Sequence, residues 1–357
     1  KCLMRRRRKE QKKRSKRSSP RNMSGAEPKS RWQATATCVR GLLFGVCGVS
    51  LAALGVAGRH GFWPKGTFVA DGGGGSIEPG PAAPNEPDAI RVVGHDPMFF
   101  TQGLYVDGDK LIEGTGLYGR SRLVEMGLPA EESLEISPKS LNVLRETSLA
   151  KDLFGEGICP IDDGSKILQL TWKRKTFLLY DRQNFTKIVS GQYSTTTNEG
   201  WGVTPWNEGK EVIVSDGSEF LHFWDAVALV KGEGVKETRE RVPVRDPASQ
   251  KVVNKINELE TIGDKIYANL WYQDYIVEIE PASGEITAWL DFRNLYPPKT
   301  RVRHADCLNG IAYDKTRDQV ILTGKLWPHY YIMSRKRFLG HAAASPMRRR
   351  LPTRIVP

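Results

Sequence analysis

Three stretches of the sequence decide the fold: KILQLTWKRKTFLLYDRQNFTKI (166–188), EVIVSDGSEFLHFWDAVALV (211–230) and KIYANLWYQDYIVEIEPASGEI (265–286). Each joins two runs rich in Val, Ile, Leu, Tyr and Trp across a short polar turn and continues into a third run after an acidic corner. Such short runs, bounded by Gly, Asp, Pro or Ser, predict β-strands. No long helical period separates them, which argues against a parallel β-α-β sheet.

The three stretches start about 45 to 55 residues apart, which indicates an internal repeat. Strand-like sequence continues from residue 90 to residue 338, so about 250 residues divide into about five units of this length. A repeat of several short strands is typical of a propeller blade. We therefore predict an all-β, five-bladed β-propeller over residues 90–338. A β-sandwich is the alternative architecture, but it explains the repeat less well.

The net charge of +12 belongs to one end of the chain of 357 residues. Residues 1–22 contain twelve Lys and Arg residues and a single acidic residue, Glu10, so the rest of the chain is close to neutral. A nearly neutral domain lacks the positive surface that binding to a nucleic-acid backbone requires, and we expect no nucleic-acid partner. The five scattered cysteines form no zinc framework, and the six histidines contain no HExxH or HxxxH pair.

Residues 41–58, GLLFGVCGVSLAALGVAG, contain no charged side chain. A helix of this length spans about 27 Å, close to the hydrocarbon thickness of a bilayer. The basic segment 1–40 before it predicts a single-pass type II signal anchor, with the tail in the cytosol and the folded domain in the ER or Golgi lumen or outside the cell. A cleaved signal peptide and a buried globular helix are the alternatives. The sequon Asn184-Phe185-Thr186 has meaning only with the predicted topology.

Two other segments are expected to have no regular structure. Residues 59–89 include the Gly- and Pro-rich run DGGGGSIEPGPAAPNEPDA and predict a linker between the membrane helix and the propeller. Residues 339–357 predict a disordered basic tail.

Eight short motifs follow one another along the predicted propeller: FTQGL (100–104), GTGLYGRS (114–121), FGEG (154–157), GWG (200–202), INELE (256–260), AN-x-W (268–271), NGIAYD (309–314) and TGKLWP (323–328). In this order and spacing the sequence resembles the glutaminyl-peptide cyclotransferases of the plant and bacterial type, over about residues 90–335. The resemblance implies a five-bladed propeller that converts the amino-terminal glutamine of peptides and proteins to pyroglutamate and releases ammonia. It also implies no catalytic metal and no cofactor. The chain has Glu199 before GWG, where the family pattern leads us to expect Asp.

The chemistry of the reaction suggests a catalytic role for three residues. The substrate α-amine must attack the carbon of its own side-chain amide, which requires a proton shuttle and donors for the developing oxyanion. Glu156 lies between two glycines, where little bulk obstructs a ligand, and is the candidate shuttle. Lys325 is the candidate cation that polarises a substrate carbonyl, and Asn257 is a neutral amide that can hold the substrate.

The candidate substrate-binding residues are an amide, an acidic residue and four aromatic side chains. Gln102 can hold the substrate amide or amine, and Glu258 is a candidate acidic partner of the amine, with Glu260 as its alternative. Strand alternation in NELE predicts Asn257 and Leu259 on one face and the two glutamates on the other. Aromatic walls exclude water and can hold an ammonium by cation–π contact. The wall candidates are Phe100, Trp172, Trp201 and Trp271.

Two other functions are compatible with a propeller. A non-catalytic propeller would bind peptide amino termini or partner proteins without releasing ammonia. A propeller hydrolase or lactonase would need a central metal, but no cluster of His, Asp and Asn recurs at positions that face the channel. The presence of both Glu156 and Lys325 favours the enzyme over the binding protein.

Overall fold

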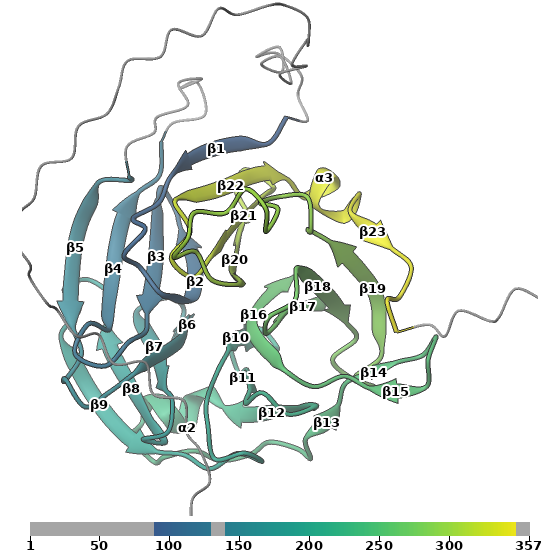
Figure 1. Cartoon of the computed structure of the whole chain (residues 1–357). Helices are drawn as coiled ribbons and strands as arrows, with labels where there is room; N and C mark the ends of the chain where they lie inside the picture. Colours follow the sequence, from purple (N-terminus) through teal and green to yellow (C-terminus); the bar gives the residue numbers. More distant parts are fainter. Residues whose placement is uncertain (1–88, 130–139, 348–357) are drawn as a thin grey trace, which may run out of the picture. The chain divides into compact units, whose positions relative to one another are not determined.

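The computed structural model describes residues 89–129 and 140–347, which form a ring of five antiparallel β-sheets around a central axis (Figure 1). The first blade contains β2 (Thr101–Asp107), β3 (Lys110–Thr115), β4 (Arg122–Gly127) and β5 (Val143–Ser148). The second contains β6 (Gly155–Ile161), β7 (Lys166–Thr171), β8 (Thr176–Asp181) and β9 (Lys187–Gln192). The third contains β10 (Val203–Trp206), β11 (Glu211–Ser215), β12 (Phe220–Asp225) and β13 (Val242–Pro243).

The last two blades each include a strand that is distant in the sequence. The fourth contains β16 (Ile256–Ile262), β17 (Lys265–Leu270), β18 (Tyr275–Ile279), β19 (Ile286–Asp291) and β23 (Ala342–Ala343). The fifth contains β20 (Leu308–Asp314), β21 (Gln319–Gly324), β22 (His329–Ser334) and β1 (Arg91–Gly94). Outside the blades lie the two-stranded sheet β14 (Arg245–Asp246) and β15 (Lys251–Val252) and the short helices α2 (Ala226–Val230) and α3 (Arg335–Leu339). The predicted five-bladed propeller is confirmed.

Burial follows the position of each strand in its blade. The middle strands, such as KILQLT and TFLLYD in the second blade, are buried along most of their length because both faces of the sheet pack against neighbouring blades. The outer strand KIVSGQ alternates between exposed and half-buried side chains. Five clusters of buried apolar residues result, one between each pair of adjacent blades.

The ring is closed by β1, the first strand of the domain. It pairs antiparallel with β22, with Arg91 opposite Ile332 and Gly94 opposite His329, and so completes the fifth blade. A buried polar contact joins this blade to the first one, because the Glu113 carboxylate of β3 accepts a hydrogen bond from the Tyr330 hydroxyl of β22 at 2.5 Å. The Thr101 hydroxyl of β2 donates to the same carboxylate at 2.7 Å. Sequence analysis did not predict which strand closes the ring.

The predicted carboxy-terminal boundary at residue 338 is wrong. Helix α3 continues to Leu339, and β23 pairs with β19 through Trp289 opposite Ala343 and Leu290 opposite Ala342. Met347 packs against the apolar cluster between the third and fourth blades. Residues 339–347 therefore belong to the folded domain, because they pair with the free edge of β19 and contribute to its apolar cluster. The remainder of the predicted tail, 348–357, lies outside the described residues.

The predicted tail 1–40 and membrane helix 41–58 lie outside the described residues, as does the linker 59–89 except for its last residue. Within residues 89–129 and 140–347, no helix has both the length and the apolar character needed to cross a membrane.

Four of the five inner strands begin with a β-bulge at the same place. Each advances three residues while its hydrogen-bonded neighbour advances two, over the following segments: 101–104 in β2, 155–158 in β6, 256–259 in β16 and 308–311 in β20. A bulge turns a side chain out of the regular alternation and bends the strand. The bulges therefore place equivalent side chains around one end of the central axis.

Beside the bulges, neighbouring inner strands approach so closely that there is no room for a side chain. The Gly157 N–H donates to the Trp201 carbonyl oxygen at 2.7 Å, and a Cβ added to Gly157 would lie 2.6 Å from that oxygen. A Cβ added to Gly202 would overlap the carbonyl oxygen of Asn257 in the next blade. These contacts are between backbone atoms, so they can be relieved only by moving whole strands.

We expect Gly202→Ala to destabilise the domain by about 1–3 kcal/mol, because overpacking against backbone forces strands apart. The matched control is Gly127→Ala in the first blade, where the nearest atom to an added Cβ is 3.8 Å away and belongs to the Leu144 side chain. The measurement is the free energy of unfolding in urea. Equal stability of the two variants would contradict the proposed close approach of the inner strands.

Candidate active site

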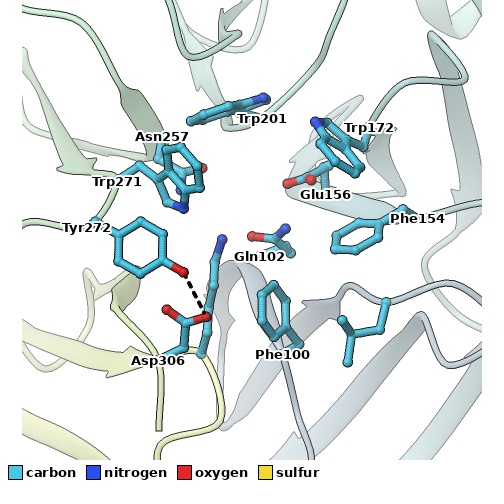
Figure 2. A pocket seen from close by; sticks show the side chains of 12 residues that line it. Phe100, Gln102, Phe154, Glu156, Trp172, Trp201, Asn257, Trp271, Tyr272 and Asp306 are labelled. Carbon is cyan, nitrogen blue, oxygen red and sulfur yellow. Dashed lines mark hydrogen bonds between the residues drawn. The ribbon is translucent and has the colours of Figure 1, made fainter. Parts of the chain in front are cut away.

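One end of the central axis contains a cavity of about 250 Å³ (Figure 2). Its walls come from all five blades, and half of the lining residues are aromatic, with polar groups among the rings. The lining residues are Phe100, Gln102, Leu117, Phe154, Glu156, Trp172, Trp201, Asn257, Trp271, Tyr272, Asp306 and Lys325. The cavity brings together eight of the nine residues predicted from the sequence to form the site.

The first set of lining residues occupies the bulges. Gln102, Glu156 and Asn257 are the second residues of the bulged segments in the first, second and fourth blades. Trp201 corresponds to them in the third blade, where its N–H donates to the Ser215 carbonyl oxygen at 2.9 Å. The fifth blade has Asn309 at this position, fully buried below the cavity, with its side-chain N–H donating to the Thr101 carbonyl oxygen at 3.0 Å.

The second set occupies the first position after the second strand of a blade, and includes Trp172, Trp271 and Lys325. The same backbone hydrogen bond fixes all three, since each N–H donates to the carbonyl oxygen of the residue just before the inner strand of its blade. The acceptors are Phe154 for Trp172 (2.9 Å), Lys255 for Trp271 (2.9 Å) and Cys307 for Lys325 (3.0 Å). The repeat of the fold therefore provides equivalent positions in the site, which carry a tryptophan in the second and fourth blades and a lysine in the fifth.

Glu156 is almost completely buried, and its carboxylate accepts no hydrogen bond from the described residues. Burial raises the pKa of Glu156 well above its usual range. The positive charge of Lys325 acts in the opposite direction, and the negative charge of Glu199 raises the pKa further. A carboxyl group in this environment can hold a proton near neutral pH and can also release it.

Lys325 is the cation of the cavity. Its side chain is only 4% exposed, and its Nζ lies 4.9 Å from the centre of the Phe100 ring. No carboxylate of the described residues lies within ion-pair distance of the Nζ atom, so its charge remains available to a ligand. The turn that holds it is strained, because Leu326 has a φ of 59°.

Gln102 and Asn257 each present a buried oxygen without a hydrogen-bond donor. Both side chains are 3% exposed or less, and neither Gln102 Oε1 nor Asn257 Oδ1 has a partner among the described residues. An unpaired buried acceptor is unfavourable unless a ligand supplies the missing donor. These two oxygens are therefore suited to receive N–H groups of a bound molecule.

Glu199 holds two of the tryptophans in place. Its Oε2 accepts hydrogen bonds from the indole N–H of Trp172 (2.7 Å) and of Trp201 (3.0 Å). The two indoles lie on either side of Glu156 in Figure 2. Sequence analysis singled out Glu199 only as a departure from the family pattern, but it connects the second and third blades at the wall of the cavity.

Aromatic contacts continue around the wall. The centres of the Trp201 and Trp271 rings are 5.4 Å apart, as are those of Phe154 and Trp172, and Phe100 lies 6.0 Å from Phe154. Each pair meets edge to face or tilted, which is the favourable arrangement for such rings. The walls therefore keep the polar groups in a medium of low dielectric constant.

The structure places Glu258 away from the cavity, so its prediction as a substrate-binding residue is wrong. The bulge at 256–259 breaks the alternation expected for NELE. Glu258 takes the position that a glycine has in each of the other four blades. Its Oε2 accepts a hydrogen bond from the Ile311 N–H at 2.9 Å, and the Leu104 N–H also donates to the carboxylate. Glu258 thus joins three blades below the cavity.

Sequence analysis missed four lining residues: Leu117, Phe154, Tyr272 and Asp306. Phe154 belongs to the quoted motif FGEG, and Tyr272 directly follows Trp271. Their place next to predicted site residues was the one sequence feature that could have identified them. Leu117 has a φ of 83° and Tyr272 a φ of 58°. Such conformations are unfavourable for residues other than glycine and concentrate at functional sites. No sequence pattern signals them.

The described residues contain no group of three or more His, Cys, Asp or Glu side chains that could hold a metal ion. Cys159 and Cys307 are both buried free thiols, so they form no disulfide with each other.

Comparison with known proteins is consistent with this site. A family model described as glutamine cyclotransferase matches residues 78–334. The chain is 33% identical over 250 residues to the glutaminyl-peptide cyclotransferase of Arabidopsis thaliana, covering 69% of this chain and 70% of that protein. The crystal structure of the glutaminyl cyclase of Myxococcus xanthus is 28% identical, with a TM-score of 0.55 over 69% of this chain and 97% of that one.

The fold and the site together define an enzyme built on a five-bladed propeller. The family match and the identity to the plant protein then fix its relationship: the chain belongs to the glutamine cyclotransferase family.

Proposed function

We propose that this enzyme converts the amino-terminal glutamine of peptides and proteins to pyroglutamate with release of ammonia, and that Glu156 carries the proton between the two nitrogens. The observation that supports this role is a buried carboxyl group with a raised pKa and no hydrogen-bond partner among the described residues. It lies in an aromatic cavity that also holds the Lys325 ammonium, which pairs with no carboxylate of those residues. Both groups are needed for the reaction, and their cavity suits a ligand as small as one amino acid.

The substrate brings its own nucleophile. A peptide α-amine has a pKa near 8, so a useful fraction is neutral at neutral pH. The amine nitrogen and the carbon of the side-chain amide belong to the same residue, and holding the folded conformation removes much of the entropic barrier to their reaction. The rings of Trp172, Trp201 and Trp271 can enforce that conformation and exclude water.

The proton transfers follow from the position of Glu156. The amine nitrogen forms a bond to the amide carbon, and the ionised Glu156 carboxylate accepts the proton that the nitrogen loses. The bond from the carbon to the original amide nitrogen then breaks, and the carboxyl group returns the proton to this nitrogen, which leaves as ammonia. One carboxyl group thus acts as base and then as acid, which its raised pKa favours.

The other polar groups stabilise the charges that develop. In the proposed mechanism, Lys325 Nζ donates a hydrogen bond to the oxygen that becomes negative as the carbon turns tetrahedral. The unpaired oxygens of Gln102 and Asn257 accept N–H groups of the substrate amine and amide. We propose that no metal ion and no cofactor takes part, because an ammonium, a proton-carrying carboxyl group and two amides supply each function that the two steps require.

The direct test is to incubate residues 89–347 with a peptide that begins with glutamine and to follow pyroglutamate by mass spectrometry and ammonia by a coupled assay, with and without a chelator. We expect turnover in both conditions. Glu156→Gln should lower kcat by about 10²–10⁴-fold, because it removes the proton carrier while keeping the shape of the side chain. A circular dichroism spectrum identical to that of the wild type would show that the fold is intact.

Binding of the peptide without release of ammonia by the wild type would instead support the non-catalytic alternative. Turnover of Glu156→Gln at the wild-type rate would remove Glu156 from the proposed role.

The pH dependence tests the charges around Glu156. Glu199→Gln removes a negative charge, so it should lower the pKa of Glu156 and move the acidic limb of kcat/KM to lower pH. Lys325→Met removes a positive charge and should move the same limb to higher pH, in addition to lowering the rate. The amine of the free substrate has the same pKa in assays of the wild type and of both variants. Differences between their pH profiles therefore reflect a change in the pKa of an enzyme group. Shifts in the same direction for both variants would contradict the assignment.

We also propose that the enzyme is a single-pass type II membrane protein with the propeller in the ER or Golgi lumen or outside the cell. The proposal is supported by the uncharged segment 41–58 after a densely basic segment, and by the exposed position of Asn184 in the turn between β8 and β9. An exposed sequon in a turn is accessible to glycosylation.

Expression of the full chain in cells with a secretory pathway tests this topology. The protein should stay with the membranes after a carbonate wash, and an amidase that removes N-glycans should lower its mass. Asn184→Gln should lack the mass change. Release by carbonate with the glycan present would favour the cleaved signal peptide, and a soluble protein without glycan would exclude both.

A further inference from the structure

A second cavity adjoins the candidate active site. It has a volume of about 370 Å³ and shares two lining residues, Tyr272 and Asp306, with the first cavity. Its other walls come from the turn after β17 and from the long connection between β19 and β20, and comprise Asp274, Pro298, Arg301, His304, Ala305 and Cys307. Unlike the first cavity, it is lined mainly by polar and charged groups.

The shared wall lies at the edge of the first cavity, since Tyr272 lines both cavities and is exposed to solvent. At about 250 Å³, that cavity is smaller than the roughly 300–1,000 Å³ typical of pockets for drug-sized ligands, so it suits one residue. The next residue follows within about 3.8 Å along the chain. A peptide bound through its first residue therefore places its second residue at the rim, of which Tyr272 and Asp306 form one side (Figure 2).

One of the charged groups in the second cavity, the Asp306 carboxylate, has no ion-pair partner among the described residues. Arg301 pairs with Asp274 at 2.6 Å and lies 4.9 Å from the Trp327 ring, so these two charges are satisfied. Among the described residues, the Asp306 carboxylate accepts hydrogen bonds only from the Cys307 N–H (2.7 Å) and the Tyr272 hydroxyl (3.4 Å). No cationic side chain of the described residues lies within ion-pair distance of it.

Asp306 is also held rigidly. Its N–H donates to the Lys325 carbonyl oxygen at 2.8 Å, and its own carbonyl oxygen accepts the Trp327 indole N–H at 2.8 Å. Tyr272, whose hydroxyl points to the carboxylate, is 63% exposed and has a positive φ. An exposed ring held in a strained conformation beside an unpaired carboxylate forms an apolar surface next to an anion.

We propose that this second cavity binds the residue that follows the amino-terminal glutamine, and that Asp306 favours a basic side chain, Lys or Arg, at that position. The methylene groups of such a side chain would lie on the Tyr272 ring while its charged end reaches Asp306. The inference rests on the proposed function, since it extends the substrate of the same site by one residue.

The test measures binding separately from turnover. In the Glu156→Gln background, the dissociation constants of two peptides that differ only in Lys or Glu after the glutamine are compared by calorimetry. We expect the Lys peptide to bind about fivefold more tightly, as for a partly exposed ion pair. Adding Asp306→Asn should abolish the preference. Adding Asp152→Asn should keep it, because Asp152 lies outside both cavities and pairs with Arg174.

The wild-type enzyme gives an independent measurement, as the ratio of kcat/KM for the same two peptides. A preference for Lys in both measurements supports the proposal. Equal binding of both peptides, or a preference that survives Asp306→Asn, overturns it. Absence of turnover of either peptide by the wild type would count against the proposed function, whereas the dissociation constants would still decide the role of Asp306.

Discussion

The close approach of the inner strands at one end of the propeller axis is the constraint on which the site depends. Backbone of one blade touches backbone of the next, and the Gly157 N–H bonds directly to the Trp201 carbonyl oxygen. Such contacts are possible because the third residue of the bulged segment, or its equivalent in the third blade, is a glycine in four of the five blades. The side chain just before it is then directed to the cavity, which is how Gln102, Glu156 and Asn257 converge from three blades. The exception is Glu258, in the fourth blade. Its carboxylate accepts hydrogen bonds from the backbone N–H groups of Ile311 in the fifth blade and Leu104 in the first, which a glycine could not do.

The cavity above these strands combines a few charges with walls that exclude water. Glu156 lies between a cation that favours its ionised form and Glu199, which favours its protonated form, so the balance is set by three side chains from three blades. Because Glu199 also accepts both indole N–H groups, the same residue fixes the shape of the wall and adjusts its charge. Replacement of Glu199 by a side chain without an acceptor oxygen would therefore change both the shape of the wall and the proton affinity of Glu156.

Much of the fold and site could be predicted because the sequence repeats. A strand pattern recognised in one repeat supports the same assignment in the equivalent segments of the other blades. Polar residues next to glycines, such as Gln102 and Glu156, were conspicuous because strands rarely place them there. Glu258 was placed wrongly because simple alternation cannot register a bulge, which is visible only from the pairing of Ile256 with Leu270 and of Leu259 with Ala268. Asp306 lies outside every quoted motif, near the end of the long connection between β19 and β20, and only the folded structure brings it to the cavity. The pairing of β23 with β19 likewise depends on contact between distant segments, which local sequence does not encode.

The closing strand β1 has a consequence for the order in which the molecule is made. Its partner β22 lies at the other end of the domain, with Arg91 opposite Ile332, so the amino-terminal strand leaves the ribosome long before the strand to which it bonds. Until then the first four blades can assemble only as an open arc with exposed edges, and such edges invite pairing with other chains. Lys325 belongs to this last blade, so the nascent chain gains its ammonium group and its closed ring at the same stage. Translation thus produces a catalytically incomplete arc until nearly the whole domain has emerged.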